Sequence, residues 1–127
     1  MPRLHLFAAV ALAPLMFASA PSPAQPAAQL VVTMANYAFT PRPIRLVAGR
    51  PVTLTFVNRS GGGHDFTARE FFASSRITAG AAPGGEVELR GGESRSVTLI
   101  PARGSFKAHC GHFMHSTFGM TDRIIVE

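Results

Sequence analysis

Alternation of apolar and polar residues with a period of two is the feature that most constrains how this chain folds. In the clearest segment, residues 51–58, Val52, Leu54 and Phe56 alternate with threonines, as expected of a strand with one buried face. Similar short segments predict strands at residues 30–35, 43–47, 86–90, 96–100, 105–110 and 123–127. Glycine and proline separate these segments, so the pattern predicts an all-β fold, a Greek-key antiparallel β-sandwich of seven to eight strands.

One stretch departs from this pattern. Residues 66–78 include Ala68–Ser75, whose composition is compatible with one or two helical turns, and we expect a short helical insertion there. The chain shows no internal repeat and no second domain, and its 127 residues suit one domain.

The first residues have the features of a secretory signal peptide. A positive start at Arg3 precedes the apolar segment Leu4–Ala20, and small residues and prolines follow. An uncleaved membrane anchor is the alternative, but Pro14 interrupts a segment that is barely long enough to span a bilayer. We therefore expect residues 1–24 to be removed, no stable transmembrane span, and a mature domain at 25–127 that is periplasmic or secreted.

The charge distribution argues against a nucleic-acid partner. Twelve Lys and Arg residues outnumber seven Asp and Glu residues, which gives a net charge of +5. These basic residues are scattered singly along the chain, with no basic run and no helix face to carry them. A net positive charge favours instead a protein partner with an acidic docking face or an anionic membrane surface.

The most informative segment is His109–Met120, near the end of the chain. It contains the only cysteine, Cys110, followed by His115 and Met120. Strand alternation directs the Cys110 sulfur inward, and His64 follows the clearest strand after three glycines. Each residue alone is most simply explained by packing or by exposure to solvent, but the combination predicts a metal site.

Two imidazoles, one thiolate and a thioether are the donors of a blue copper centre that transfers electrons. Zinc is the competing metal, although a zinc site has no use for methionine. A hydrolytic zinc site would also need a carboxylate base, for which Asp65 and Glu70 are the only candidates. The residues therefore predict one copper ion per chain and no enzymatic activity.

At these residues the sequence resembles the cupredoxin family, which includes plastocyanin, pseudoazurin and rusticyanin. The resemblance extends from the strand at Leu30 to the end of the chain. It implies that His64 is the upstream imidazole ligand, Cys110 the thiolate, His115 the downstream imidazole and Met120 the axial thioether. Four residues separate Cys110 from His115, as in rusticyanin, whereas plastocyanin-like loops have two.

Two further histidines leave the ligand set open. His109 is expected to point to the opposite strand face from Cys110, whereas His112 is an alternative ligand to His115. We favour His115 because its distance from Met120 fits the family. Asp65, next to His64, is a candidate for orienting the loop through a hydrogen bond.

The resemblance implies transfer of single electrons between redox partners by a monomer. The alternative is a protein that binds, buffers or delivers copper to a copper-handling partner, because His109, His112 and Met114 are extra donors beside the site. A metal-free sandwich used for adhesion or assembly is a third hypothesis.

Overall fold

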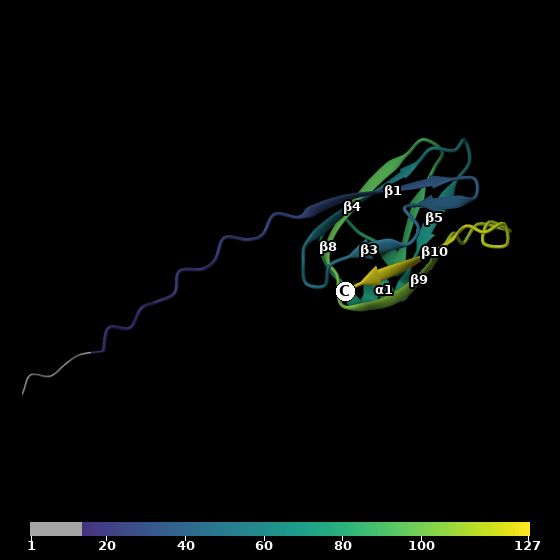
Figure 1. The fold of residues 1–127 in the computed structure, drawn as a ribbon. Coiled ribbons are helices and arrows are strands. Elements are labelled where there is room, and N and C mark those ends of the chain that lie inside the picture. The colour runs from purple at the N-terminus through teal and green to yellow at the C-terminus, as the bar shows by residue number, and fades with distance from the viewer. Residues whose placement is uncertain (1–13) are drawn as a thin grey trace, which may run out of the picture.

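The computed structural model describes residues 14–127, which form a sandwich of two five-stranded sheets (Figure 1). The first sheet has the order β2 (Ala38–Thr40), β1 (Ala28–Ala35), β4 (Val52–Asn58), β8 (Ser94–Ile100), β6 (Arg76–Ala79). The second has the order β3 (Ile44–Leu46), β10 (Thr121–Val126), β9 (Gly104–His109), β5 (His64–Thr67), β7 (Glu86–Leu89). One helix, α1 (Arg69–Ser74), and a 3₁₀ turn at Pro83–Gly85 complete the fold.

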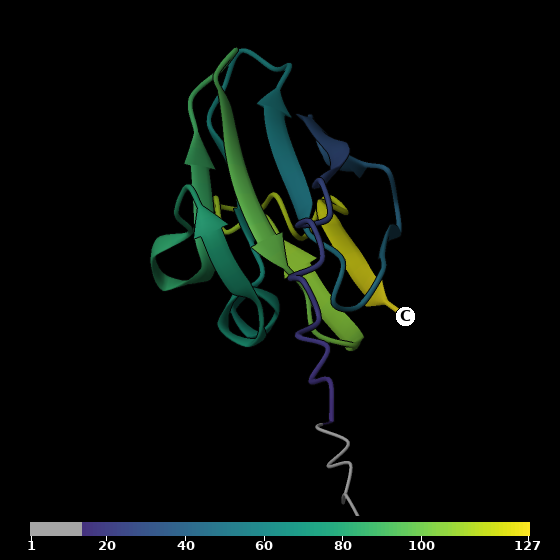
Figure 2. The same ribbon diagram turned by 90° about the vertical axis from the view of Figure 1, so that its left-hand side faces the viewer.

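The predicted all-β sandwich with a short helical insertion is confirmed. Each of the seven predicted segments contains a strand, and Figure 2 shows β8 lying beside β4 in the first sheet. Three strands, β2, β5 and β6, were not predicted, so the described residues form ten strands rather than seven to eight. β5 was not predicted because Phe66 is its one apolar residue among three polar ones, so the segment shows no polar–apolar alternation although all four residues are buried.

Most of the described strand pairs run antiparallel, as predicted, but two pairs are parallel, so the sheets are mixed. β1 runs parallel to β4, with Leu30 opposite Leu54, and β10 runs parallel to β3, with Ile124 opposite Ile44. Between β1 and β4 the chain passes through β2 and then through β3 in the other sheet before it returns to the side of β1. Alternation predicts which face of a strand is buried but not the direction in which it runs.

Phenylalanine rings join the two sheets at the centre of the core. Phe66 of β5 has its ring centroid 4.9 Å from that of Phe56 in β4 and 5.2 Å from that of Phe39 in β2. The helix α1 buries Phe71 and Phe72, and the Phe72 ring lies 6.3 Å from Phe66. The insertion at residues 66–78 therefore supplies core aromatic rings, and Figure 1 places α1 away from the loop that follows β9.

The N-terminal segment lies outside the sandwich. Residues 14–27 form no helix or strand and lead away from the sheets (Figure 1). Residues 1–13, most of the apolar part of the predicted signal peptide, lie outside the described residues, so the predicted boundary at residue 24 stays a prediction. Within residues 14–127, no helix has the length and apolar character needed to cross a bilayer.

Replacing Phe66 by alanine tests whether this ring holds the sheets together. We expect Phe66→Ala to lower the free energy of unfolding by about 3–5 kcal/mol, because a buried ring is lost and a cavity remains. Urea denaturation measures this difference. Val31→Ala, at a side chain that is 51% exposed on β1, is the control and should change stability by less than about 0.5 kcal/mol. Equal losses in the two variants would contradict the proposed role of Phe66.

Candidate metal centre

Three predicted ligands, His64, Cys110 and His115, converge at the end of the sandwich that carries the loop after β9. His64 Nδ1 lies 3.1 Å from His115 Nδ1, and the Cys110 Sγ atom lies 3.8 Å from His64 Nδ1 and 3.3 Å from His115 Nδ1. His64 and Cys110 are completely buried, whereas His115 is partly exposed. His64 is the first residue of β5 rather than part of a glycine loop, so a strand fixes its position.

A hydrogen bond to Asn36 determines which nitrogen of His64 faces the cluster. His64 Nε2 lies 2.8 Å from Asn36 Oδ1, in the turn between β1 and β2. An amide oxygen only accepts hydrogen bonds, so Nε2 carries the proton and Nδ1 presents a free lone pair. Burial lowers the pKa of His64, and the neighbouring His115 and His112 lower it further, so the imidazole stays neutral and able to bind a metal.

Main-chain hydrogen bonds close the loop that carries the other donors. The Cys110 amide donates to the Met120 carbonyl at 3.1 Å, and the Met120 amide donates to the His115 carbonyl at 3.0 Å. The Ser116 hydroxyl donates to the Cys110 carbonyl at 2.7 Å. Met120, the fourth predicted ligand, is completely buried, and its main chain is hydrogen-bonded to both Cys110 and His115.

Asp65 fastens this loop to β5. Its carboxylate accepts hydrogen bonds from the Gly111 amide, at 2.9 Å to each oxygen, and from the Thr67 hydroxyl at 2.6 Å. Its amide donates to the Cys110 Sγ atom at 3.5 Å. The expectation that Asp65 orients the loop through a hydrogen bond therefore agrees with the structure.

The donor atoms are arranged as a bound cation requires. Metal–nitrogen bonds of about 2.0–2.1 Å and metal–sulfur bonds of about 2.3 Å place neighbouring ligand atoms roughly 3.1–3.8 Å apart. The three separations in the cluster, 3.1, 3.3 and 3.8 Å, fall in this range. Burial raises the pKa of the Cys110 thiol, so a cation that replaces its proton is needed to hold it as a thiolate. The residues present therefore fit a copper ion.

Among the described residues, His109 and His112 lie outside this trio of donors. His112 Nε2 lies 2.8 Å from Glu88 Oε1, and the His112 ring stacks on His115 with centroids 5.3 Å apart. His109 is exposed on the outer face of β9, as the strand alternation predicted. His115, and not His112, is therefore brought together with His64 and Cys110.

Sequence reasoning missed Asn36 and the aromatic residue that follows it. The Tyr37 ring packs edge-on against His115, with centroids 5.0 Å apart, and also lies 5.1 Å from Phe118. An asparagine after a strand looks like an ordinary turn residue. Only the fold shows that this turn reaches the site.

Exposed apolar side chains lie in the ligand loop and in the turn that packs against His115. We call this set the loop patch, and it consists of Tyr37, Phe113, Met114 and Phe118, which are 40%, 90%, 41% and 58% exposed. Large exposed apolar side chains gathered in one place are typical of an interaction surface.

Comparisons with known proteins agree with this fold. The model of the cupredoxin-like domain family matches residues 6–126. A reduced auracyanin from Roseiflexus castenholzii superposes with a TM-score of 0.61 at 20% identity, over 80% of this chain and 98% of that chain. Auracyanin A, a blue copper protein from Chloroflexus aurantiacus, gives 0.60 at 17% identity, over 80% of this chain and 100% of that chain.

Larger proteins contain the same fold. A multicopper oxidase from Aquifex aeolicus superposes with a TM-score of 0.63 at 13% identity, over 85% of this chain but only 31% of the oxidase. The comparison with curated proteins found no match. Since the family model spans nearly the whole sequence and the donors converge, the chain belongs to the cupredoxin-like domain family and its His64–Cys110–His115–Met120 cluster is a single type 1 copper site.

Proposed function

We propose that this protein is a periplasmic or secreted carrier of single electrons and not an enzyme. The observation that carries the proposal is the buried trio of His64, Cys110 and His115, whose donor atoms already lie at metal-binding separations. A copper ion bound there would supply the one-electron couple between Cu(I) and Cu(II). The location rests on the signal-peptide features of the first residues and stays a proposal.

The residue roles follow from the donor types. His64 and His115 would bind through Nδ1, Cys110 through its thiolate and Met120 through its thioether. Asn36 and Asp65 hold the outer side of this set, one through His64 and the other through the Gly111 amide. Donors held in this way keep their positions when the charge at the site changes, as rapid electron exchange requires.

The loop patch is the proposed surface for electron exchange. His115 is the one partly exposed residue of the trio, and its ring lies 5.0 Å from Tyr37 within this patch. A partner that covers Phe113 and Phe118 would therefore come close to a copper ligand without any rearrangement of the buried donors.

Copper delivery is the alternative function, and the positions of the additional donors His109, His112 and Met114 test it. A protein that hands copper on would bring His109, His112 or Met114 toward the cluster. In the structure His112 is bonded to Glu88, His109 faces outward from β9, and Met114 belongs to the exposed loop patch. This arrangement favours electron transfer.

An absorption and EPR spectrum of the Cu(II)-loaded protein tests the proposal. We expect an intense visible band from thiolate-to-copper charge transfer that a mild reductant bleaches reversibly while copper is retained. Cys110→Ser and His115→Ala should abolish this band, whereas His109→Ala, the control, should retain it. Copper binding without the band, or release of copper on reduction, would favour delivery instead.

Asn36 should affect copper affinity through His64. We expect Asn36→Ala to weaken copper binding by about 10–100-fold, because His64 loses the partner that fixes its ring and its protonated nitrogen. Competition with a chromophoric copper chelator measures this change. Gln29→Ala, at an exposed position on β1, is the control. An unchanged affinity in Asn36→Ala would show that packing alone orients the ring.

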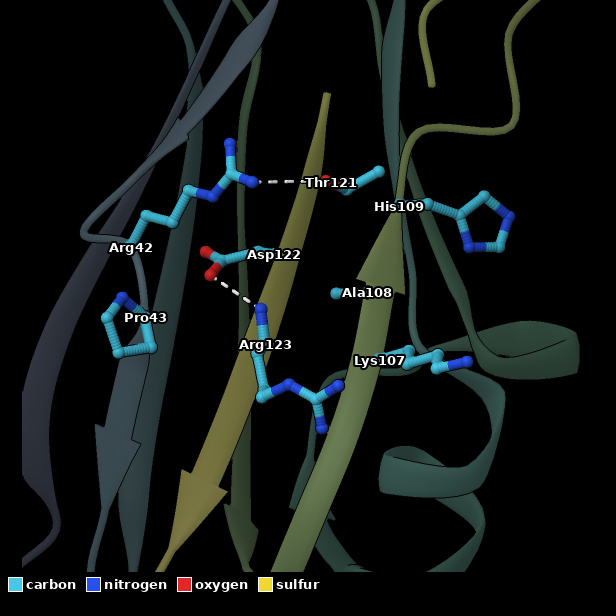
Figure 3. Close-up of a pocket in the computed structure, with 8 residues that line it drawn as sticks. All are labelled: Arg42, Pro43, Lys107, Ala108, His109, Thr121, Asp122 and Arg123. Carbon is cyan, nitrogen blue, oxygen red and sulfur yellow. Dashed lines mark hydrogen bonds between the residues drawn. The ribbon is translucent and has the colours of Figure 1, made fainter. Parts of the chain in front are cut away.

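The partner is proposed to be a redox protein with an acidic docking face. A groove of about 500 Å³ lies over β9 and β10 and is lined by Arg42, Pro43, Lys107, Ala108, His109, Thr121, Asp122 and Arg123 (Figure 3). The only acid in this lining, Asp122, is buried, so the exposed charge of the groove is positive. The groove adjoins the site, because His109 precedes Cys110 and Thr121 follows Met120. Arg42 donates to the Gly119 carbonyl and to the Thr121 hydroxyl.

Charge reversal in the groove should slow reaction with an anionic reagent. We expect the Cu(I) protein to react with hexacyanoferrate(III) at a rate that falls as salt is added, because ions screen the attraction. Lys107→Glu should lower the rate several-fold at low salt and reduce the salt dependence. Arg76→Glu on β6 of the other sheet changes the net charge equally and is the control. Equal effects in both variants would contradict docking at the groove.

A further inference from the structure

A second set of possible metal ligands lies beside the copper cluster. It consists of Asp65 on β5, Glu88 on β7 and His112 in the loop, and one ligand atom of each lies within 4.8 Å of the others. His112 Nε2 is 2.8 Å from Glu88 Oε1 and 3.8 Å from Asp65 Oδ2. Bonds of about 2.0–2.2 Å place neighbouring ligand atoms roughly 3.0–3.8 Å apart, so a cation would replace the hydrogen bond between His112 and Glu88 and separate these two side chains slightly.

The pairing of β5 with β7 favours a positive charge between Asp65 and Glu88. β5 and β7 pair antiparallel with Asp65 directly opposite Glu88, so two carboxylates occupy neighbouring positions on one face. Like charges directly opposite each other destabilise a strand pair unless a cation lies between them. His112 occupies this position from the loop and adds a third donor to the two carboxylates.

The surroundings leave room for His112. A Cβ atom at Gly63 would lie 3.0 Å from His112 Cε1, so a side chain at residue 63 would push the imidazole away. The Asp65 side chain is 3% exposed and forms the buried side of the candidate site, whereas the side chains of His112 and Glu88 are 32% and 50% exposed. The set is thus rigid on the inside and open to solvent on the outside, where water would complete the coordination.

We propose that Asp65, Glu88 and His112 bind a second metal, a divalent cation such as Zn²⁺. One imidazole and two carboxylates suit zinc, whereas the thiolate and thioether of the neighbouring cluster favour copper. The two sites therefore differ in donor type as well as in position.

Occupation of this site would tune the copper site, a consequence that rests on the proposed electron-transfer function. The His112 ring stacks on His115 with a centroid separation of 5.3 Å, so the second cation would lie close to the copper ligands. A nearby positive charge favours the reduced, less positively charged form of the copper site. Zinc binding should therefore raise the reduction potential.

Calorimetric titration of the copper-loaded protein with Zn²⁺ tests the proposal, together with metal analysis after dialysis. We expect one Zn²⁺ per chain with copper retained. Glu88→Gln and His112→Ala should each weaken zinc binding by about tenfold or more, since even the loss of an outer partner of a metal ligand costs about 10–100-fold. Glu86→Gln, two residues away on β7, is the matched control and should bind zinc as the wild type does.

Three results would overturn the second site: no zinc binding, equal binding in Glu88→Gln, or loss of the visible copper band as zinc binds. Voltammetry gives an independent readout, with a rise in potential on adding zinc to the wild type and none in Glu88→Gln. Failure of electron transfer would appear separately, as the absence of a reversible copper band before any zinc is added. The zinc stoichiometry would still test the second site in that case.

Discussion

The geometry of the copper site depends on the place where β9 stops pairing with β5. The two strands pair at Thr67 and His109, and the same register continued would place Gly111 opposite Asp65. The main-chain pairing does not continue to this position. The Gly111 amide donates its hydrogen bond to the Asp65 carboxylate, where a continued ladder would provide a main-chain carbonyl. A side chain is longer than a carbonyl group, so the loop is displaced from β5 and remains bonded to it. His64, Cys110 and His115 meet beside this anchored end of the strand pair.

β5 carries three functions in three consecutive residues. His64 supplies a metal ligand, Asp65 anchors the ligand loop, and Phe66 joins the phenylalanine rings of both sheets. The stability of the core and the position of the ligand therefore depend on the same short strand. This dependence explains why β5 is buried on both faces and carries no sequence pattern typical of a strand.

Much of the fold could be predicted from the sequence, because half-buried strands such as Val52–Asn58 keep strict alternation. The directions of β1 and β10 relative to their neighbours could not, because alternation is the same in parallel and antiparallel pairs. The convergence of His64 with the Cys110 loop was expected from donor chemistry. Asn36 and Glu88 were not predicted as neighbours of the site, since each looks like an ordinary surface residue until the strands are paired.

The two halves of the ligand set differ in how readily they can move. His64 is completely buried at the start of β5, a strand with neighbours on both sides, so its exposure would require this strand to separate from the sheet. His115 lies in a loop whose turns bond mainly to each other and to Cys110 and Met120. Metal uptake and loss should therefore proceed through opening of residues 111–119. His64 and the rest of β5 stay folded meanwhile, so the loop can close again on an unchanged strand.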